Sequence, residues 1–322
     1  MYCSQLVFAI GFYDPRFEFS RHIDRQNQAD RFFHMASAPT TPVKHESGLR
    51  WRVGVWWMIL RTALEERLVY RGDFALGTLM RFLPIITQIF LWSAVFGSLA
   101  SNKDTIAGFH FEDMVAYYLL TMIARAFSSM PGLASGIAIQ IRDGEIKRYL
   151  IQPIDLIGFL LLNRIAHKVA YYTVATAPFA LVFFLCRDYF LGGWPGWYVF
   201  SAFVASLVMG FLIGFFLEAT IGMIGFWFLE VTSLLFIYML FSFFLSGHMF
   251  PLALLPDNVE WFVNLMPLKY LAYFPAAVFL GKIPPEDLPM ELAIEFAWLV
   301  FFIFLCRFAY KNGVKRYSGF GG

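Results

Sequence analysis

The sequence predicts an all-α polytopic membrane protein with six transmembrane helices, an N-terminal interfacial helix and an extracellular re-entrant helical element. Three observations predict this class. Hydrophobic residues make up 59% of the 322 residues, including 39 phenylalanines, and only 15% of the residues are charged. The mean hydropathy is +0.61. A soluble domain does not bury this many apolar side chains, and several apolar runs reach the about 20 residues that cross a bilayer as a helix.

The first 47 residues differ from the rest of the chain. Residues 1–47 are polar and hold a single apolar run, Leu6 to Phe12, which is too short to span a membrane. No basic segment precedes that run and no cleavage site is evident, so we do not interpret it as a secretory signal. We expect residues 1–47 to be disordered, or to be a doubtful extension of a protein whose real start is Met35.

Residues 48–73 mix aromatic and charged side chains. Trp56 and Trp57 are followed there by Arg61 and Glu65. This mixture predicts an amphipathic helix that lies in the cytosolic interface of the membrane before the first span. The alternative is a helix that packs on another part of the protein.

Residues 74–310 form the predicted transmembrane domain. Each of its six apolar runs is long enough to cross the hydrocarbon core as a helix, which satisfies its own backbone hydrogen bonds. The apolar segment Ile154 to Leu162 is predicted to be a separate short helix, because Arg164 and Lys168 follow it. The six predicted spans are Phe74 to Leu99, Met114 to Ala134, Val169 to Cys186, Tyr198 to Leu217, Gly225 to Ser246 and Leu292 to Tyr310.

The fourth predicted span is rich in small residues. Gly210 and Gly214 form a Gly-x-x-x-Gly pair, which predicts a close helix contact. The sequence leaves open whether that contact lies within the chain or between two chains.

Lysine and arginine predict the orientation, because cytoplasmic loops are enriched in them. The segment before the first span, the second loop and the tail, residues 311–322, are rich in these residues, whereas the other loops carry few. Both termini and the second loop are therefore predicted to be cytoplasmic. The net charge of +2 is too small to indicate a nucleic-acid partner, and membrane lipid is the expected surrounding.

Charged residues inside an apolar span are costly, so each one is a candidate functional residue. Arg125 lies near the middle of the second predicted span, and Glu230 lies near the cytosolic end of the fifth. At about 1.5 Å per residue the two lie at similar depths, which makes an ion pair across the bundle a hypothesis. The alternative is a separate partner for each, such as Ser128 or Ser233.

Three polar motifs interrupt or follow the apolar runs. The island Gln140 to Asp155 and the segment Gly247 to Glu291 are punctuated by Gly and Pro, and Pro267 and Pro275 are predicted to divide the latter into short re-entrant or interfacial helices. The motifs read Arg142-Asp143-Gly144-Glu145-Ile146 with Leu150-Ile151-Gln152-Pro153, then Ser246-Gly247-His248-Met249-Phe250-Pro251 with Pro256, and finally Lys315-Arg316-Tyr317-Ser318-Gly319.

In order and spacing these motifs resemble ABC-2 type transporter permeases, of the bacterial subgroup with a separate ATPase and often a second permease. The resemblance covers Gly54 to Gly322. It implies the permease subunit of an exporter in the cell inner membrane. It assigns ATPase coupling to Arg142, Asp143, Gly144, Glu145, Ile146, Leu150 and Pro153. It assigns an extracellular gate to Ser246, Gly247, Phe250, Pro251 and Pro256, where interfacial anchoring by aromatic residues is a compatible role.

The pattern of the island agrees with a docking element. After Gly144, the apolar residues Ile146, Tyr149 and Leu150 share one face of a short helix, and charged residues face water. A helix with two such faces fits a cleft in a soluble subunit. Without the resemblance, charged residues that merely cap a cytosolic loop would explain the segment better.

The sequence contains no Gly-x-x-x-x-Gly-Lys-Ser/Thr motif, so we expect ATP and Mg²⁺ to bind to a partner P-loop ATPase and no cofactor to bind to this chain. No His-Glu-x-x-His motif or cysteine cluster indicates a metal site, and no catalytic residues stand out. A polytopic membrane enzyme and an ATP-independent membrane scaffold are the alternatives. The sequence determines neither the transported substrate nor whether a second permease chain is identical or related.

Overall fold

The computed structural model describes residues 49–68, 71–98, 105–152, 154–190, 192–228 and 230–317. Within these ranges the regular structure is helical, apart from one isolated bridge between Ile106 and Phe109. Contacts divide the chain into residues 1–55 and 56–322, and the arrangement below is that of residues 56–322. The expectation for residues 1–47 lies outside the described residues.

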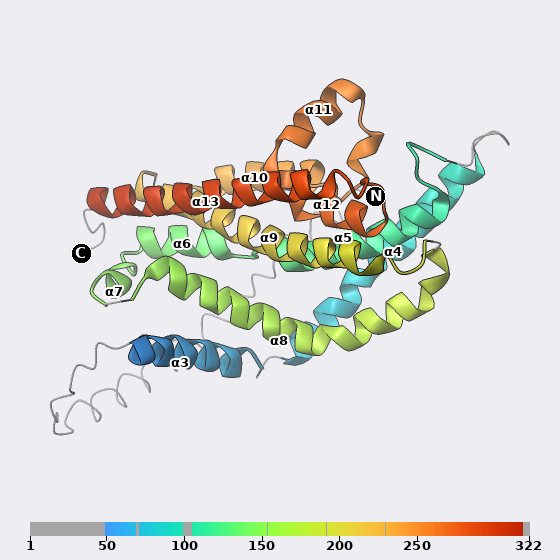
Figure 1. The fold of residues 1–322 in the computed structure, drawn as a ribbon. Coiled ribbons are helices and arrows are strands. Elements are labelled where there is room, and N and C mark those ends of the chain that lie inside the picture. The colour runs from blue at the N-terminus through green and yellow to red at the C-terminus, as the bar shows by residue number, and fades with distance from the viewer. Residues whose placement is uncertain are drawn as a thin grey trace. The chain divides into compact units, whose positions relative to one another are not determined.

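The apolar helices confirm the all-α polytopic membrane class (Figure 1). Among the described residues, four helical segments have the length and composition of membrane spans, and two shorter apolar helices lie within the first and fifth predicted spans. The count of six spans stays a prediction. The four segments are α5 (Phe111–Ser128) with α6 (Leu133–Arg142), α8 (Leu156–Leu185), α9 (Gly196–Met223) with the 3-10 turn η2 (Ile224–Phe226), and α13 (Leu288–Arg316); the two shorter helices are Phe82–Gly97, within α4 (Arg71–Gly97), and α10 (Thr232–Leu245).

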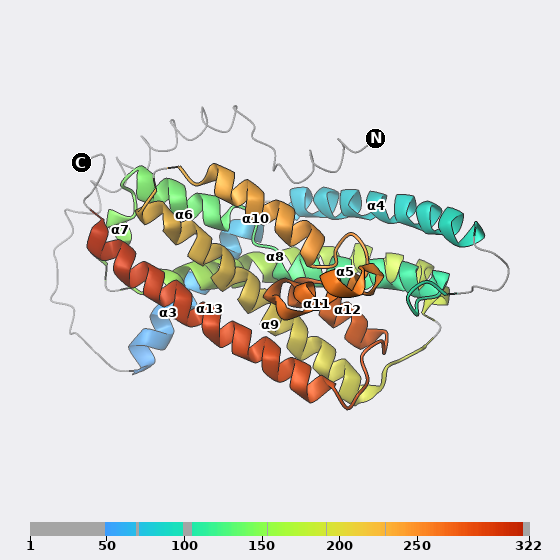
Figure 2. The same cartoon turned by 90° about the horizontal axis from the view of Figure 1, so that it is seen from above.

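Helix α9 lies at the centre of the helical bundle, where it contacts α5, α6, α12 (Tyr273–Phe279) and α13 (Figure 2). Glycines allow these close contacts. A Cβ atom on Gly214 would lie 2.2 Å from the Ser128 carbonyl oxygen, and one on Gly210 would lie 2.8 Å from the Tyr270 carbonyl oxygen. The Gly-x-x-x-Gly pair therefore serves close contacts within the chain.

The second predicted span, Met114 to Ala134, is divided in the structure. Helix α5 ends at Ser128, and α6 begins at Leu133 after Gly132, whose φ of +71° lies in the left-handed region that glycine adopts readily. Backbone groups freed at such a break need partners in a membrane. Helix α8 supplies them: Lys168 Nζ donates to the Ala126 and Ser129 carbonyl oxygens, and Arg164 donates to the Pro131 carbonyl oxygen at 2.9 Å.

The prediction of a separate short helix at Ile154 to Leu162 was wrong. Helix α8 runs without interruption from Leu156 to Leu185. Arg164 and Lys168 do not end it, because their charged groups bind the carbonyl groups freed at the α5–α6 break. Helix α8 thus contains Arg164 and Lys168, whereas the predicted span begins only after them, at Val169.

The fifth predicted span, Gly225 to Ser246, is shorter in the structure than expected. Gly225 belongs to η2, which continues α9, and α10 begins only at Thr232. Gly225 is held there by α6, since a Cβ atom on it would lie 3.2 Å from Ala138 Cα. Residues 227, 228, 230 and 231 are not helical.

The segment after α10 folds into the short helices that were predicted. They are η3 (Leu252–Leu254), α11 (Asp257–Leu265), η4 (Pro267–Leu271) and α12. Pro267 begins η4, as expected, but Pro275 lies in the first turn of α12, where the missing N–H costs no hydrogen bond. The break between these two short helices falls instead at Ala272, the residue between η4 and α12.

Helix α3 (Leu49–Leu68) covers most of the predicted interfacial segment. Ala63 is buried, and a Cβ atom on Gly158 of α8 would lie 3.1 Å from the Trp56 ring. The opposite side exposes Trp57 together with the ion pair of Arg61 and Glu65. The Trp56 ring thus contacts α8, and both the interfacial position and the packed alternative stay predictions.

Candidate functional site

The charged island follows α6 and leads into α8 through α7 (Lys147–Leu150). Gly144 has φ of +75°, which makes the bend after Asp143 a position that favours glycine. The charged residues pair with one another at the surface, Arg142 with Asp143 at 3.0 Å and Arg148 with Glu145 at 2.9 Å. The charged face predicted for the island is therefore present.

The predicted apolar face of the island is not available for docking. Ile146 is 1% exposed and belongs to the protein's own core, and the Tyr149 ring packs on that of Phe159 with centroids 5.5 Å apart. The exposed apolar residue is Ile151, which is 84% exposed. Pro153 lies outside the described residues. The assignment of Ile146 to an outward face was wrong because the Gly144 bend turns it back towards α6, where its N–H donates to the Gln140 carbonyl oxygen at 3.0 Å.

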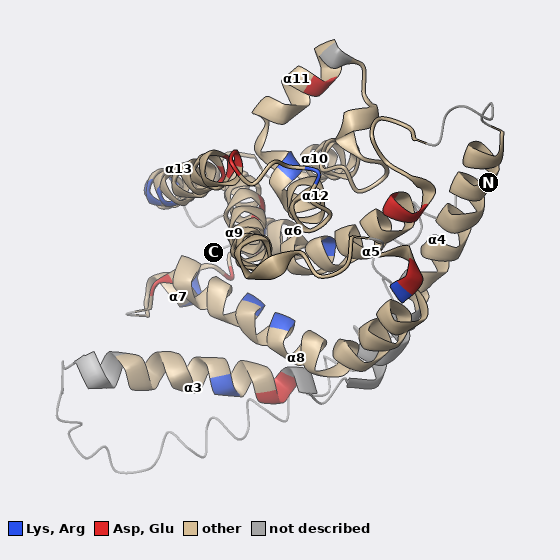
Figure 3. Ribbon diagram, turned by 45° about the vertical axis from the view of Figure 1, so that its right-hand side comes forward, with Lys and Arg blue, Asp and Glu red and all other residues tan. Residues whose placement is uncertain are grey.

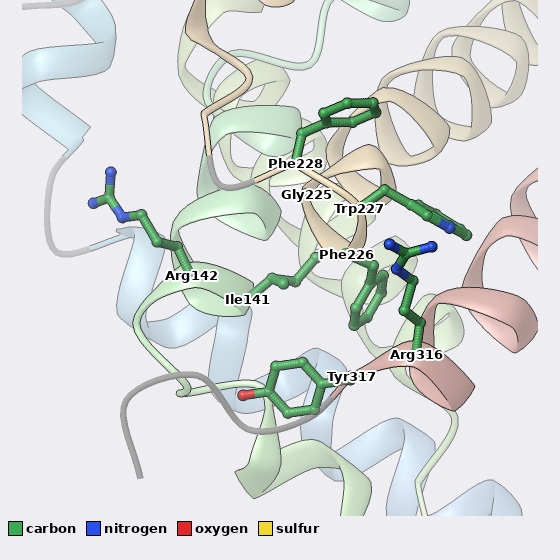
Figure 4. Close-up of a pocket in the computed structure, with 8 residues that line it drawn as sticks. All are labelled: Ile141, Arg142, Gly225, Phe226, Trp227, Phe228, Arg316 and Tyr317. Carbon is green, nitrogen blue, oxygen red and sulfur yellow. The ribbon is translucent and has the colours of Figure 1, made fainter.

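A small cleft of about 220 Å³ lies at the base of the island (Figure 4). It is bounded by the end of α6, by η2 with the residues after it, and by the end of α13. Two arginines line it, but Figure 4 shows Arg142 pointing away from Arg316. Arg142 is also paired with Asp143. The cleft therefore does not gather positive charge, and its lining is largely aromatic, with Phe226, Trp227, Phe228 and Tyr317.

The hypothesis of an ion pair between Arg125 and Glu230 was wrong. Glu230 lies before α10, where it is exposed and accepts the Thr232 backbone N–H at 2.8 Å. Arg125 donates to Ser242 Oγ of α10 at 3.4 Å. The proposed depth of Glu230 assumed a helix that began at Gly225, whereas α10 begins after it.

Glu218 of α9 is a carboxylate that interacts electrostatically with Arg125. It also interacts electrostatically with Arg164 and Lys168 beside the α5–α6 break. Figure 3 shows how few charged residues lie along the helices. Sequence reasoning missed Glu218 because it ended the fourth span at Leu217, one residue too early. Extension of the span by one helical turn would have included Glu218 as an intramembrane charge.

Replacement of Lys168 by methionine should destabilise the protein. Methionine keeps the apolar stem but leaves the Ala126 and Ser129 carbonyl groups without their ammonium donor. An unsatisfied buried polar group costs about 1 to 3 kcal/mol, so the midpoint of thermal unfolding in detergent should fall. Lys311→Met, at an exposed position of α13, is the control that should leave the midpoint unchanged. Equal midpoints for Lys168→Met and the unmodified protein would contradict this role.

Acidification should loosen the first turn of α10. Hydrogen bonds from the Thr232 hydroxyl and backbone N–H lower the pKa of Glu230 below its usual 4.5. A lowered pKa stabilises the fold above the unfolded value and loses that contribution as the pH falls through the folded value. The protection of the Thr232 amide, measured as its exchange rate relative to the intrinsic rate at each pH, should therefore fall selectively below about pH 4.5, and Glu230→Gln should remove this loss of protection. A retained dependence in the variant would refute the assignment.

Tyrosines of α5 hold the start of the predicted extracellular gate. Gly247 has φ of +75°, and its carbonyl oxygen accepts the Tyr117 hydroxyl. The Tyr118 hydroxyl donates to the Met249 carbonyl oxygen at 2.6 Å. Ser246 is fully buried, and its carbonyl oxygen accepts the Tyr273 N–H at 2.9 Å. Neither α5 tyrosine stands out in the sequence pattern.

The remaining predicted gate residues lie along the same segment. Phe250 is half-buried, Pro251 is buried, and Pro256 is exposed directly before α11. Their contacts place them at the turn between α10 and α11, and a gating role for them stays a prediction.

Two ion pairs connect this segment to the spans. Lys282 pairs with Asp113 of α5 at 2.5 Å, and its ammonium lies 4.8 Å from the centre of the Phe109 ring. Lys269 of η4 pairs with Glu291 of α13 at 2.9 Å, and the Tyr270 hydroxyl donates to the same carboxylate at 3.0 Å. The segment is therefore attached at both α5 and α13.

In the described part of the chain, no three His, Cys, Asp or Glu residues gather as a metal site would require. Comparison with known proteins gives one family. Residues 82–321 match the family model described as ABC-2 family transporter protein. The search of curated proteins gives no match.

Proposed function

Because the chain belongs to the ABC-2 family of transporter proteins, we propose that it is the permease of an exporter powered by a separate P-loop ATPase. Family membership itself makes the chain a multi-pass membrane permease subunit of an ABC transporter. The proposal adds the export direction, the separate ATPase, the bacterial inner membrane as location and cytoplasmic termini. ATP and Mg²⁺ would bind to the partner ATPase.

The island between α6 and α8 carries this proposal. It exposes Ile151 beside Arg148 and Glu145, which form a solvent-facing ion pair. An exposed apolar side chain in a segment that also carries exposed charges suits a protein-binding surface. Ile146 packs in the core of the bundle and anchors the island there. A displacement of Ile151 would therefore be transmitted to α6 and α8.

The charged group around Glu218 supports a role for the α5–α6 break in transport. Polar residues and interrupted helices inside a membrane mark transport pathways more often than inert packing does. Arg125 connects this group to α10, which buries only Ser242 of its described side chains. A helix held this lightly can move with little loss of packing. A second permease chain, identical or related, would complete the pathway.

Vesicles that contain the chain and its ATPase test the proposal. The tracer is an amphipathic molecule extracted from native membranes as the candidate substrate. ATP should drive it across the membrane, away from the side that carries the ATPase. ATP-independent movement would favour the scaffold or channel alternative, and chemical change of the tracer would favour a membrane enzyme.

A further inference from the structure

We propose that α13 transmits movement between the island and the extracellular segment, with Arg307 and Glu291 as the positioning residues at its two ends. This inference rests on the proposed function. The two residues are 16 positions apart, which corresponds to about 24 Å along a helix. One helix thus carries an attachment near each side of the membrane.

The inner attachment is a two-pronged ion pair. Both terminal nitrogens of the Arg307 guanidinium donate to the Asp155 carboxylate, with Nη2 to Oδ2 at 2.9 Å. Asp155 is the last residue of the island and also caps α8, because it accepts the Gly158 N–H at 2.8 Å. Paired hydrogen bonds fix orientation as well as distance. A shift of the island therefore pulls on α13.

The outer attachment is the Glu291 carboxylate. It accepts Lys269 Nζ and the Tyr270 hydroxyl, both from η4, and Lys269 is only 6% exposed. One turn further along α13, Glu295 is fully buried and accepts the Ser206 hydroxyl of α9 at 3.2 Å. The connection continues to the predicted gate through Tyr273, two residues after η4, whose N–H donates to the Ser246 carbonyl oxygen.

Helix α13 has the continuity that such a link needs. It is unbroken over 29 residues, and its single proline lies in the first turn. It packs along α9 and closes tightly on η2, where a Cβ atom on Gly313 would meet the Phe226 ring at 2.3 Å. A rigid helix with two attachments moves as one body, which is a physical route for coupling between distant sites.

The test uses the complete chain with its ATPase and a maleimide label at the outer segment. Asn258→Cys places the label on exposed α11, with Cys3→Ser and Cys186→Ser leaving the buried Cys306 as the one other thiol. The ATP-dependent change in labelling rate should fall at least threefold in Arg307→Gln, Asp155→Asn and Glu291→Gln. Asp155→Asn keeps an oxygen that can cap α8. Lys311→Gln, which removes an exposed charge one turn beyond Arg307, is the matched control and should behave like the parent.

Hydrolysis and assembly are measured in the same samples. The proposal expects the variants to remain assembled and to hydrolyse ATP while the ATP-dependent change in labelling rate falls. The double variant Asp155→Asn/Arg307→Gln should reduce that change no further than either single variant. An unchanged labelling response in assembled Arg307→Gln, Asp155→Asn or Glu291→Gln would overturn the link. A parent that purifies without an ATPase would overturn the proposed function. A parent that hydrolyses ATP without any ATP-dependent change in labelling would overturn the link alone.

Discussion

Ile151→Asp should weaken association with the ATPase at least tenfold, which corresponds to about 1.4 kcal/mol. Ile151 is the apolar side chain that the island exposes, and an aspartate would have to be desolvated in any apolar recess that receives it. Truncation at the centre of an interface often costs more than this. Titration of the purified permease with its ATPase, followed by ultracentrifugation, measures the change.

The matched control is Ile151→Leu, which keeps an apolar side chain and should retain most of the affinity. Ile151→Asp should not change the unfolding midpoint, because the residue is 84% exposed. Ile146→Asp, by contrast, should lower the unfolding midpoint, since that residue is 1% exposed. Full affinity in Ile151→Asp would remove the island from the interface.

Gly214→Ala should destabilise the protein by about 1 to 3 kcal/mol or prevent it from folding. The added methyl group would lie 2.2 Å from the Ser128 carbonyl oxygen. That oxygen belongs to the backbone at the end of α5, so relief requires α5 and α9 to separate. Thermal unfolding in detergent, with size-exclusion chromatography for folding, measures the effect.

Gly136→Ala is the control for a glycine in a helix without such a contact. Nothing lies within 4 Å of a Cβ atom at Gly136 of α6. Alanine favours the helix by about 1 kcal/mol over glycine, so the midpoint should stay constant or rise. A Gly214→Ala protein as stable as the parent would show that α5 and α9 approach less closely than described here.

The sequence predicts the fold class well because composition and the length of apolar runs depend on the membrane, not on tertiary detail. The ends of helices are less predictable. The charge of Lys168 predicts the end of a helix, but its partners are carbonyl groups 39 and 42 residues away in sequence. The break before α10 likewise depends on Gly225 packing against α6. Such partners become visible only in three dimensions.

The candidate site could be predicted only in part, because it too depends on contacts between residues far apart in the sequence. The motif around Gly144 identifies the island, and the positive φ there explains the glycine. The face that each residue presents depends on the direction of the bend, which the sequence pattern does not contain. Ile146 was therefore expected outside, whereas Ile151 is the exposed residue. Glu218 was missed because the predicted fourth span ends at Leu217, one residue before it.

The central claim is that this permease works with a separate ATPase. Its most direct test is purification of the tagged chain from its native host in mild detergent, with mass spectrometry and ATP hydrolysis measured on the same sample. The account predicts a P-loop ATPase in fixed proportion, ATP hydrolysis in the purified complex, and loss of both when Ile151→Asp is purified in the same way. A chain that repeatedly purifies alone, without hydrolysis, would contradict it.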